Sequence, residues 1–496
     1  MWASNRKSLA SRHHSEGVPA GERKLVIILP AQNPSHDLCK VVASAVALGY
    51  PAPVIVNWAL KQETDTTDKS SRSHLTKISG VLDYLEWATS DDAYGASRLN
   101  EADLVLMLDA YDVWLQLPPE VLVRRYFAAN QRADDALAMK HANLADSDLP
   151  RQTIIASAQK RCYAPQSKMT DLHCSELPES TFPANIFGFW TDSTFFNYQY
   201  ARPWSLNSGS FMGPAGDLRG YFQRVNDRME EYLAQSPTSE QLSGDQGTFA
   251  EIFGEQEVWR DSLHRQGAAQ RTQGKQLTTS ELEYHVGLDY LQELFYPTCY
   301  SEHAGSFLRL QDSEYVRRKS KEAGVSPPRI QKLPVEIVSA PSPFTSLEDD
   351  SAQSQTWGSV PLYTDLWTAI IPVAVHHNAW RNGLKGRLET WWDRTWYFPY
   401  LRELLDRYMA MNGTSTGSIA EIRAFGVNRT LTLWPYRAEA EPYAALLYGK
   451  NETGVQRLEP ADWDAVCESR NTVVDSGRHW YDEVFRDDQG GLAHHS

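Results

Sequence analysis

The sequence predicts an α/β fold in which a mixed, mostly parallel sheet is flanked by helices. Two continuous apolar runs, residues 24–29 and 104–108, have the pattern of strands that are buried on both faces of such a sheet. Residues 38–48 carry apolar side chains at helical spacing, and a short strand pattern follows at 54–57. This β-α-β order is typical of the first half of a nucleotide-binding sheet.

The same periodicity assigns the later elements. It predicts helices at residues 74–87, 120–129, 217–235 and 244–252, and strands at 137–139, 154–157, 370–375 and 430–436. The polar stretch 260–280 predicts a loop.

These elements divide the chain into three parts. Residues 1–22 form a polar tail, 23–400 form the main domain, and 411–496 form a small C-terminal region to which no chemistry can be attached. Within the main domain, residues 319–350 are rich in proline and charge without periodicity, which predicts an insertion on the surface.

The composition is that of an ordinary globular protein with a strong negative charge. The 496 residues carry a net charge of −15, which excludes a nucleic-acid partner because phosphate backbones select basic faces. No apolar run reaches the roughly 18 residues of a transmembrane helix. An anionic substrate would therefore need local cations or a metal ion in its site. Nothing in the sequence indicates the oligomeric state.

The sequence gives mixed signals about the compartment. The N-terminal tail lacks the apolar core of a signal peptide, so either the protein is cytoplasmic or a targeting segment is absent from this chain. N-glycosylation patterns at Asn412, Asn428 and Asn451 favour the lumen of the secretory pathway, in the endoplasmic reticulum or the Golgi. Cys162 and Cys174 can pair there, and the odd total of five cysteines leaves one thiol free.

The first candidate site lies where the second buried strand ends. Asp109 and Asp112 follow residues 104–108 directly, at the carboxyl end of a strand, where open α/β sheets place their ligands. Carboxylate oxygens suit a hard divalent cation, which commonly carries a phosphorylated substrate. The alternative is that both aspartates only cap a turn.

Two histidines and a lysine extend this site. His376 and His377 end a strand pattern, and a neutral imidazole can complete a shell of Asp109 and Asp112 oxygens around Mn²⁺. Lys385, a few residues on, would place a positive charge on a leaving diphosphate. The alternative for each histidine is a hydrogen-bonded place in the core.

Four further residues are candidates, each with a structural alternative. Lys77 can meet a nucleotide phosphate or ribose, or can be a solvated surface charge. Asn207, between small residues, offers a donor and an acceptor to a ligand, or lies in a glycine-rich turn. Asp245 can serve chemistry or cap a helix. Trp190 can stack on an acceptor sugar or belong to the core.

Five short motifs occur in the order in which a known family carries them. The chain resembles the glucosyltransferase domain of lysyl hydroxylases and related collagen galactosyltransferase-type domains over residues 22–400. The resemblance rests on Asp109-Ala-Tyr-Asp112, Leu206-Asn-Ser-Gly209, Gly244-Asp-Gln246, Leu288-Asp289 before Leu294-Phe295, and Val375-His376 with Asn378.

The resemblance implies a GT-A fold and a retaining glycosyltransferase that uses Mn²⁺ or Mg²⁺. The enzyme would move glucose or galactose from a UDP-sugar to a hydroxyl of a glycan or protein. Asp109, Asp112 and His376 would hold the metal, Tyr111 would stack near the uracil, and Asn207 and Asp245 would contact the donor sugar. Lys77, Lys385 and Asn378 complete the expected nucleotide-sugar site.

The chain departs from the family at two of these motifs, and alternatives stay open. The family's His-Gly-Asn-Gly reads His376-His-Asn378-Ala here, which leaves open which histidine binds the metal. The acidic run before Gln246 shrinks to Asp245, which leaves the donor sugar open. One alternative is a transferase that uses GDP-mannose. The other is a carbohydrate-binding protein that keeps the fold without turnover.

Overall fold

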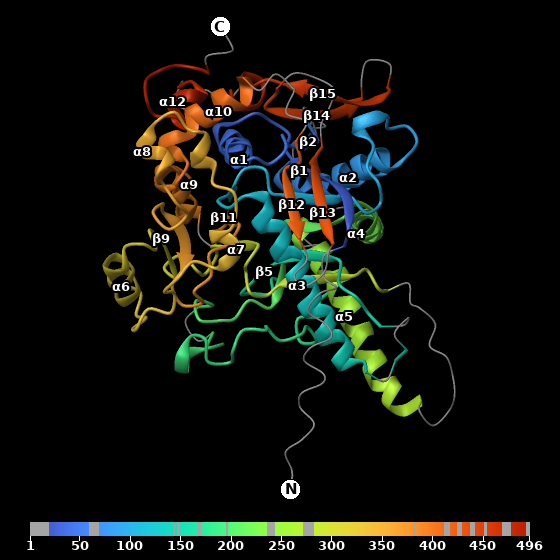
Figure 1. Ribbon diagram of the computed structural model, residues 1–496. Coiled ribbons are helices and arrows are strands. Elements are labelled where there is room, and N and C mark those ends of the chain that lie inside the picture. Colours follow the sequence, from blue (N-terminus) through green and yellow to red (C-terminus); the bar gives the residue numbers. More distant parts are fainter. Residues whose placement is uncertain are drawn as a thin grey trace.

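A computed structural model gives the arrangement of these elements (Figure 1). It describes residues 19–58, 69–142, 144–145, 149–165, 170–194, 197–235, 244–270, 282–379, 382–410, 417–423, 429–436, 442–450, 454–468 and 478–492. None of the helices in these ranges combines the length and apolarity needed to cross a bilayer. The three glycosylation patterns, at Asn412, Asn428 and Asn451, lie outside the described residues.

A ten-stranded, mainly parallel sheet forms the centre of the molecule, so the predicted α/β class is confirmed. Its main path runs β15-β14-β2-β1-β3-β6-β5-β7, and β13 joins β1 and β12. The strands are β1 (Gly21–Pro30), β2 (Val54–Val56), β3 (Leu104–Leu108), β5 (Ile154–Gln159), β6 (Ser205–Pro214), β7 (Val286–Asp289), β12 (Ala420–Arg423), β13 (Thr430–Pro435), β14 (Ala445–Lys450) and β15 (Gln456–Ala461). The long β6 is antiparallel to both of its neighbours, β3 and β5.

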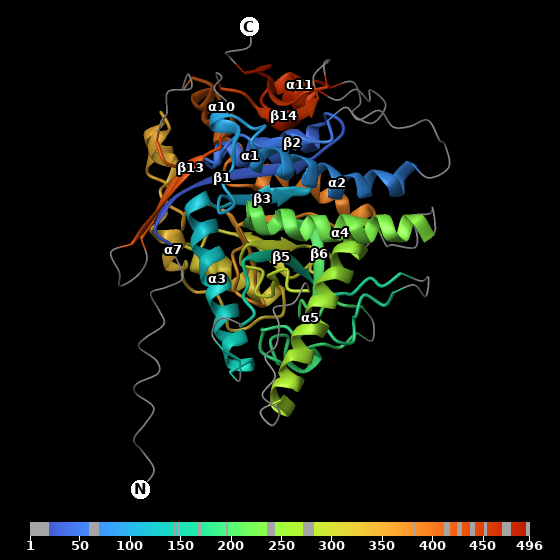
Figure 2. The same cartoon turned by 90° about the vertical axis from the view of Figure 1, so that its right-hand side faces the viewer.

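Helices cover both faces of this sheet. Alternate side chains of β1 point to opposite faces and are apolar on both, so each face needs a covering layer. Leu25, Ile27 and Leu29 pack with α1 (His36–Ala47), α3 (Pro119–Lys140) and α10 (Leu401–Ala410). Val26 and Ile28 pack on the other face with α2 (Lys69–Thr89), α4 (Ala215–Gln235) and α5 (Gly244–Gln270). Figure 2 looks onto this second layer. The continuous apolar pattern of β1 thus reflects burial from both sides.

Two stretches that the sequence predicts as a strand and as a loop are helical instead. Residues 137–139, expected as a strand, belong to the last turn of α3, because no proline or glycine interrupts the helix after Pro119. Residues 260–270, expected as a loop, extend α5. The buried Arg260 bonds to Glu257 on the same helix and to Glu283, which holds this turn against the sheet end.

The segment 319–350 is not simply a surface insertion. It contains the end of α6 (Ser313–Glu322), α7 (Val335–Val338) and the start of α8 (Asp350–Gln353). Ile337 and Phe344 in this segment are fully buried in the main hydrophobic core. The prolines and charges conceal these apolar anchors, which are too widely spaced to give a periodic pattern.

Strands from the C-terminal region complete the central sheet. β13 pairs in parallel with β1, and β14 pairs in parallel with β2. A disulfide joins Cys39 in α1 to Cys467 in α11 (Trp463–Cys467), and a second joins Cys162 to Cys174 as the sequence allowed. Cys299 is the free, buried thiol. Disulfides persist in oxidising compartments such as the secretory lumen.

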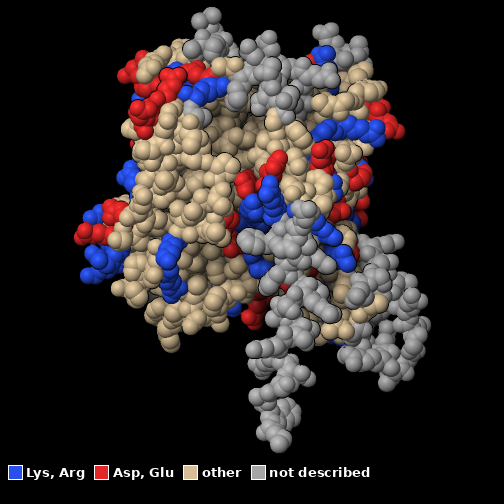
Figure 3. Space-filling model, viewed as in Figure 1, with Lys and Arg blue, Asp and Glu red and all other residues tan. Residues whose placement is uncertain are grey.

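Two small sheets lie beside the central one. β4 (Val113–Leu115), β11 (Ala374–His376) and β8 (Phe295–Pro297) form one, and β9 (Gly305–Leu308) pairs with β10 (Leu362–Asp365) in the other. On the face shown in Figure 3, acidic and basic side chains are interspersed among uncharged ones. The first strand of the three-stranded sheet, β4, starts directly after the turn that follows β3. The pairing of β4 therefore determines which side chains contact Asp109 and Asp112.

Candidate metal centre

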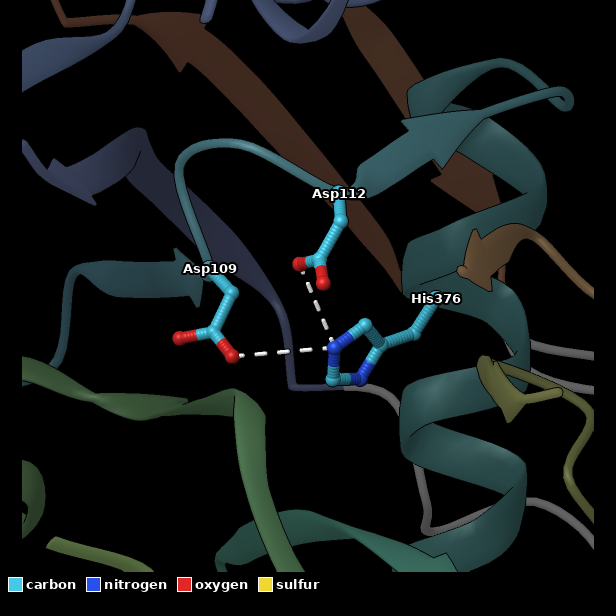
Figure 4. A group of neighbouring side chains, drawn as sticks. All are labelled: Asp109, Asp112 and His376. Atoms are coloured by element: carbon cyan, nitrogen blue, oxygen red, sulfur yellow. Dashed lines mark ion pairs between the residues drawn. The ribbon is translucent and has the colours of Figure 1, made fainter. Parts of the chain in front are cut away.

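Strand pairing brings His376 to the two aspartates. Asp109 and Asp112 occupy the turn between β3 and β4, and β11 runs antiparallel to β4 with His376 opposite Val113. The His377 amide donates to the Asp112 carbonyl oxygen at 2.7 Å, which fixes this register. His376 Nε2 lies 3.3 Å from Asp112 Oδ1 and 3.7 Å from Asp109 Oδ2 (Figure 4).

These three side chains, called the metal group below, form a cluster of the right size for one cation. One ligand atom from each lies within 4.8 Å of the others. Asp112 and His376 are buried, whereas Asp109 is partly open to solvent. Two carboxylates and one imidazole suit Mn²⁺, and Mg²⁺ less well because of the nitrogen ligand. The donor set therefore fits the metal that the resemblance implies.

Neighbouring side chains keep Asp112 ionised. Burial raises the pKa of this carboxyl, but His376 and the Lys385 ammonium lower it by more than burial raises it, so the net pKa lies well below its usual range. Lys385 Nζ lies 3.3 Å from Asp112 Oδ2 and its side chain is half-exposed. A ligand that binds the metal can thus also reach Lys385.

Lys77 is a buried part of this site and not a solvated surface charge. Its Nζ lies 2.8 Å from Asp109 Oδ1 and 2.5 Å from Asp245 Oδ2, and it donates to the Ser208 carbonyl at 3.1 Å. Burial lowers the pKa of Lys77, but the two carboxylates outweigh it and the net pKa is raised. The ammonium therefore links the metal group to the start of α5.

Asn207 and Asp245 belong to a polar network that surrounds the metal group. Asn207 is buried in β6 and meets His376 Nδ1 with its Oδ1 at 3.2 Å. Asp245, in the first turn of α5, accepts from Ser208 Oγ at 2.8 Å in addition to Lys77. Both residues thus contact the metal group or its neighbours.

Close packing of β6 against the group leaves no room for a side chain at Gly209. A Cβ built there would lie 2.3 Å from His376 Cε1 and 2.9 Å from Asp109 Oδ2. The Gly209 carbonyl also accepts the Asp109 amide at 2.8 Å. The glycine is therefore required by the approach of two proposed metal ligands.

We expect Gly209→Ala to weaken Mn²⁺ binding by about 100-fold, since the added methyl group displaces a ligand, and to cost about 1–3 kcal/mol of stability through overpacking. Titration followed by electron paramagnetic resonance measures the affinity. Gly220→Ala in α4 is the matched control, because a Cβ there meets nothing within 4 Å. Equal Mn²⁺ affinity in both variants would contradict the placement of the site.

His377 does not join the metal group. Its ring packs 4.0 Å from that of Trp114, centre to centre, and 5.8 Å from that of Trp391. The side chain is buried, and neither ring nitrogen has a hydrogen-bond partner among the described residues. Burial, with a smaller effect of Arg387, lowers the pKa of His377 to about 3. The geometry thus selects His376 as the candidate ligand.

His377 should make the metal-free protein sensitive to acid. Because its pKa is lower in the folded state than the usual 6.5, only the unfolded chain gains the proton as the pH falls from 6.5 towards 3. Relative to His377→Leu, we expect the wild type to lose about 2 kcal/mol of unfolding free energy between pH 7 and pH 5. Urea denaturation at both pH values measures this difference. Equal losses of unfolding free energy in the wild type and in His377→Leu would contradict the acid sensitivity of His377. A loss of Mn²⁺ affinity in His377→Leu would contradict its place outside the metal group.

The remaining predicted residues have other contacts. Tyr111 is partly buried, and its hydroxyl accepts from the Gln32 amide at 3.2 Å and donates to the Asn33 carbonyl. Asn378 Oδ1 accepts the Cys299 amide at 2.9 Å, which closes the loop after β11. Trp190 is half-exposed and therefore lies outside the core.

Sequence reasoning missed two supporting residues, Gln159 and Gln246. Both side chains accept from Asn207 Nδ2 at 3.1 Å. Gln246 belongs to the Gly244-Asp-Gln246 motif, so its place beside Asp245 was a usable signal. Gln159 ends β5 with no distinguishing pattern, and only strand pairing reveals it.

Comparisons with known proteins give this chain no family. No family model matches it, and no curated protein matches it.

Proposed function

We propose that this protein is a metal-dependent glycosyltransferase of the GT-A type that moves a hexose from a UDP-sugar to a hydroxyl of a glycan or protein. The observation that carries the proposal is the group of Asp109, Asp112 and His376 at the carboxyl end of β3, flanked by Lys77 and Lys385. This combination of a cation site with two lysines suits a diphosphate. The mixed sheet, with the candidate metal-binding side chains at its strand ends, agrees with this type of fold.

The protein's own charges define where the diphosphate would lie. The metal, when bound, would act as a Lewis acid that stabilises the charge developing on the departing UDP. Lys385 reaches the same place from the solvent side, because its ammonium lies beside Asp112 and half of its side chain is exposed. Lys385 would hold a fixed positive charge on the leaving group without a proton transfer.

Further residues support other parts of the proposed site, beginning with the uracil position. Tyr111 lies between the β1–α1 loop and the metal group, so its ring supports the proposed uracil position. Asp245 holds Lys77 in place and stands at the helix start that faces the group. Trp190 and the neighbouring Phe189 expose their rings, which supports an acceptor surface there. The two disulfides support the lumen of the secretory pathway, in the endoplasmic reticulum or Golgi, as the compartment.

A donor screen tests this proposal. The purified protein is incubated with Mn²⁺ and, separately, with UDP-glucose, UDP-galactose, UDP-N-acetylglucosamine and GDP-mannose, and nucleotide release is measured with and without EDTA. We expect release from UDP-glucose or UDP-galactose that EDTA abolishes. Release from GDP-mannose alone would contradict the UDP assignment. No release from any donor, and no rise in melting temperature with any of them, would indicate a protein without turnover.

A further inference from the structure

The amide group of Asn207 has all of its hydrogen-bonding atoms engaged. Nδ2 donates to Gln159 Oε1 and to Gln246 Oε1, both at 3.1 Å. Oδ1 accepts the Gly209 backbone amide at 3.1 Å and lies 3.2 Å from His376 Nδ1. The residue is 3 % exposed. A sugar hydroxyl could bind this amide only by displacing a partner, so direct contact with the donor sugar is disfavoured.

The backbone of Gly209 fixes which way the amide points. An amide N–H can only donate, so the atom that faces it must be the Asn207 oxygen. The same oxygen faces His376 Nδ1, which must then carry the proton in the neutral ring. His376 Nε2 is left with its lone pair, and it is the atom that faces Asp109 and Asp112.

We propose that Asn207 is a positioning residue that holds His376 in the tautomer and ring orientation needed to bind the metal. This inference rests on the metal site of the proposed function and replaces the expected contact between Asn207 and the donor sugar. A metal-bound imidazole commonly donates its other N–H to an oxygen acceptor, and loss of such a partner typically weakens metal binding by about 10- to 100-fold. Gln159 and Gln246 in turn hold the Asn207 amide.

Two substitutions of similar size separate the acceptor from the rest of the side chain. Asn207→Leu removes the oxygen that faces His376, and we expect it to weaken Mn²⁺ binding by about 10- to 100-fold in a titration followed by electron paramagnetic resonance. Asn207→Asp keeps an acceptor oxygen, so its affinity should equal or exceed that of the wild type. Asn130→Leu is the matched control, because Asn130 is buried and its Oδ1 accepts from Gln152 Nε2 at 3.0 Å away from the metal group.

A second readout follows the tautomer itself. Nitrogen NMR of the metal-free protein with ¹⁵N-labelled histidine, at a pH where the ring is neutral and assigned by the signal missing in His376→Gln, should show the single proton of His376 on Nδ1. In Asn207→Leu we expect the signal to shift towards the Nε2–H form. A neutral wild-type ring with its proton on Nε2 would overturn the inference.

The metal titration distinguishes failure of this inference from failure of the proposed function. A wild-type protein that binds no Mn²⁺ would contradict both. A wild type that binds Mn²⁺ with the same affinity as Asn207→Leu would leave the metal site standing and overturn the role of Asn207. If Asn207→Leu does not fold, Asn207→Asp decides, because a loss of affinity despite the retained oxygen contradicts the inference and an undiminished affinity supports it.

Discussion

Asp112→Asn should reduce metal-dependent nucleotide release by at least about 100-fold while the protein stays folded. Asparagine has the shape of aspartate but supplies only a neutral carbonyl oxygen, so a hard cation loses a charged ligand. Asp112 is the candidate ligand chosen for this test, because it is buried and pairs with both His376 and Lys385. Release of nucleotide at saturating donor and increasing Mn²⁺ measures the effect.

The control for this change is Asp227→Asn on the exposed face of α4. It removes one negative charge from the same protein at a position outside the metal group, and it should leave both activity and Mn²⁺ affinity unchanged. Circular dichroism and the melting temperature verify the fold of both variants. A folded Asp112→Asn protein with the activity of the wild type would remove Asp112 from the site.

Lys77→Met should destabilise the metal-free protein by about 3 kcal/mol, because it leaves the carboxylates of Asp109 and Asp245 together without their shared cation. The lysine is nearly buried, so solvent screens this loss only weakly. Mn²⁺ should restore part of the stability, since it supplies positive charge beside Asp109. Urea denaturation with and without Mn²⁺ measures both effects.

The double variant Lys77→Met/Asp245→Asn separates charge from packing. It removes one of the two negative charges that Lys77 balanced, so we expect it to recover about half of the lost stability. If the double variant is as unstable as Lys77→Met alone, the loss comes from the packing of the lysine stem. A Lys77→Met protein as stable as the wild type would contradict the buried ion pair.

The parts of the fold that the sequence predicted are those with local signals. Leu25 to Leu29 and Leu104 to Leu108 are buried on both sides, so every residue is apolar and the pattern is unambiguous. The C-terminal strands are predicted less completely. The sequence predicts a strand at 430–436 but not its partner, because pairing with β1 is a contact between residues about 400 positions apart.

The same limit applies to the metal group. Asp109 and Asp112 are recognisable because they follow a buried strand, and both histidines are recognisable because they end one. The choice between His376 and His377 depends on the register of β11 against β4, which directs one ring towards the aspartates and the other towards Trp114. The burial of Lys77 likewise depends on the packing of α2 against β6 and α5, which its own helical pattern does not reveal.

The proposed function requires that this site binds a nucleoside diphosphate through a metal ion. Isothermal titration of the wild-type protein with UDP, in Mn²⁺ and in EDTA, tests it most directly. We predict binding in Mn²⁺ that is lost in EDTA and lost in Asp112→Asn. Equal affinity for UDP with and without metal, or no binding in the presence of Mn²⁺, would contradict the proposed function.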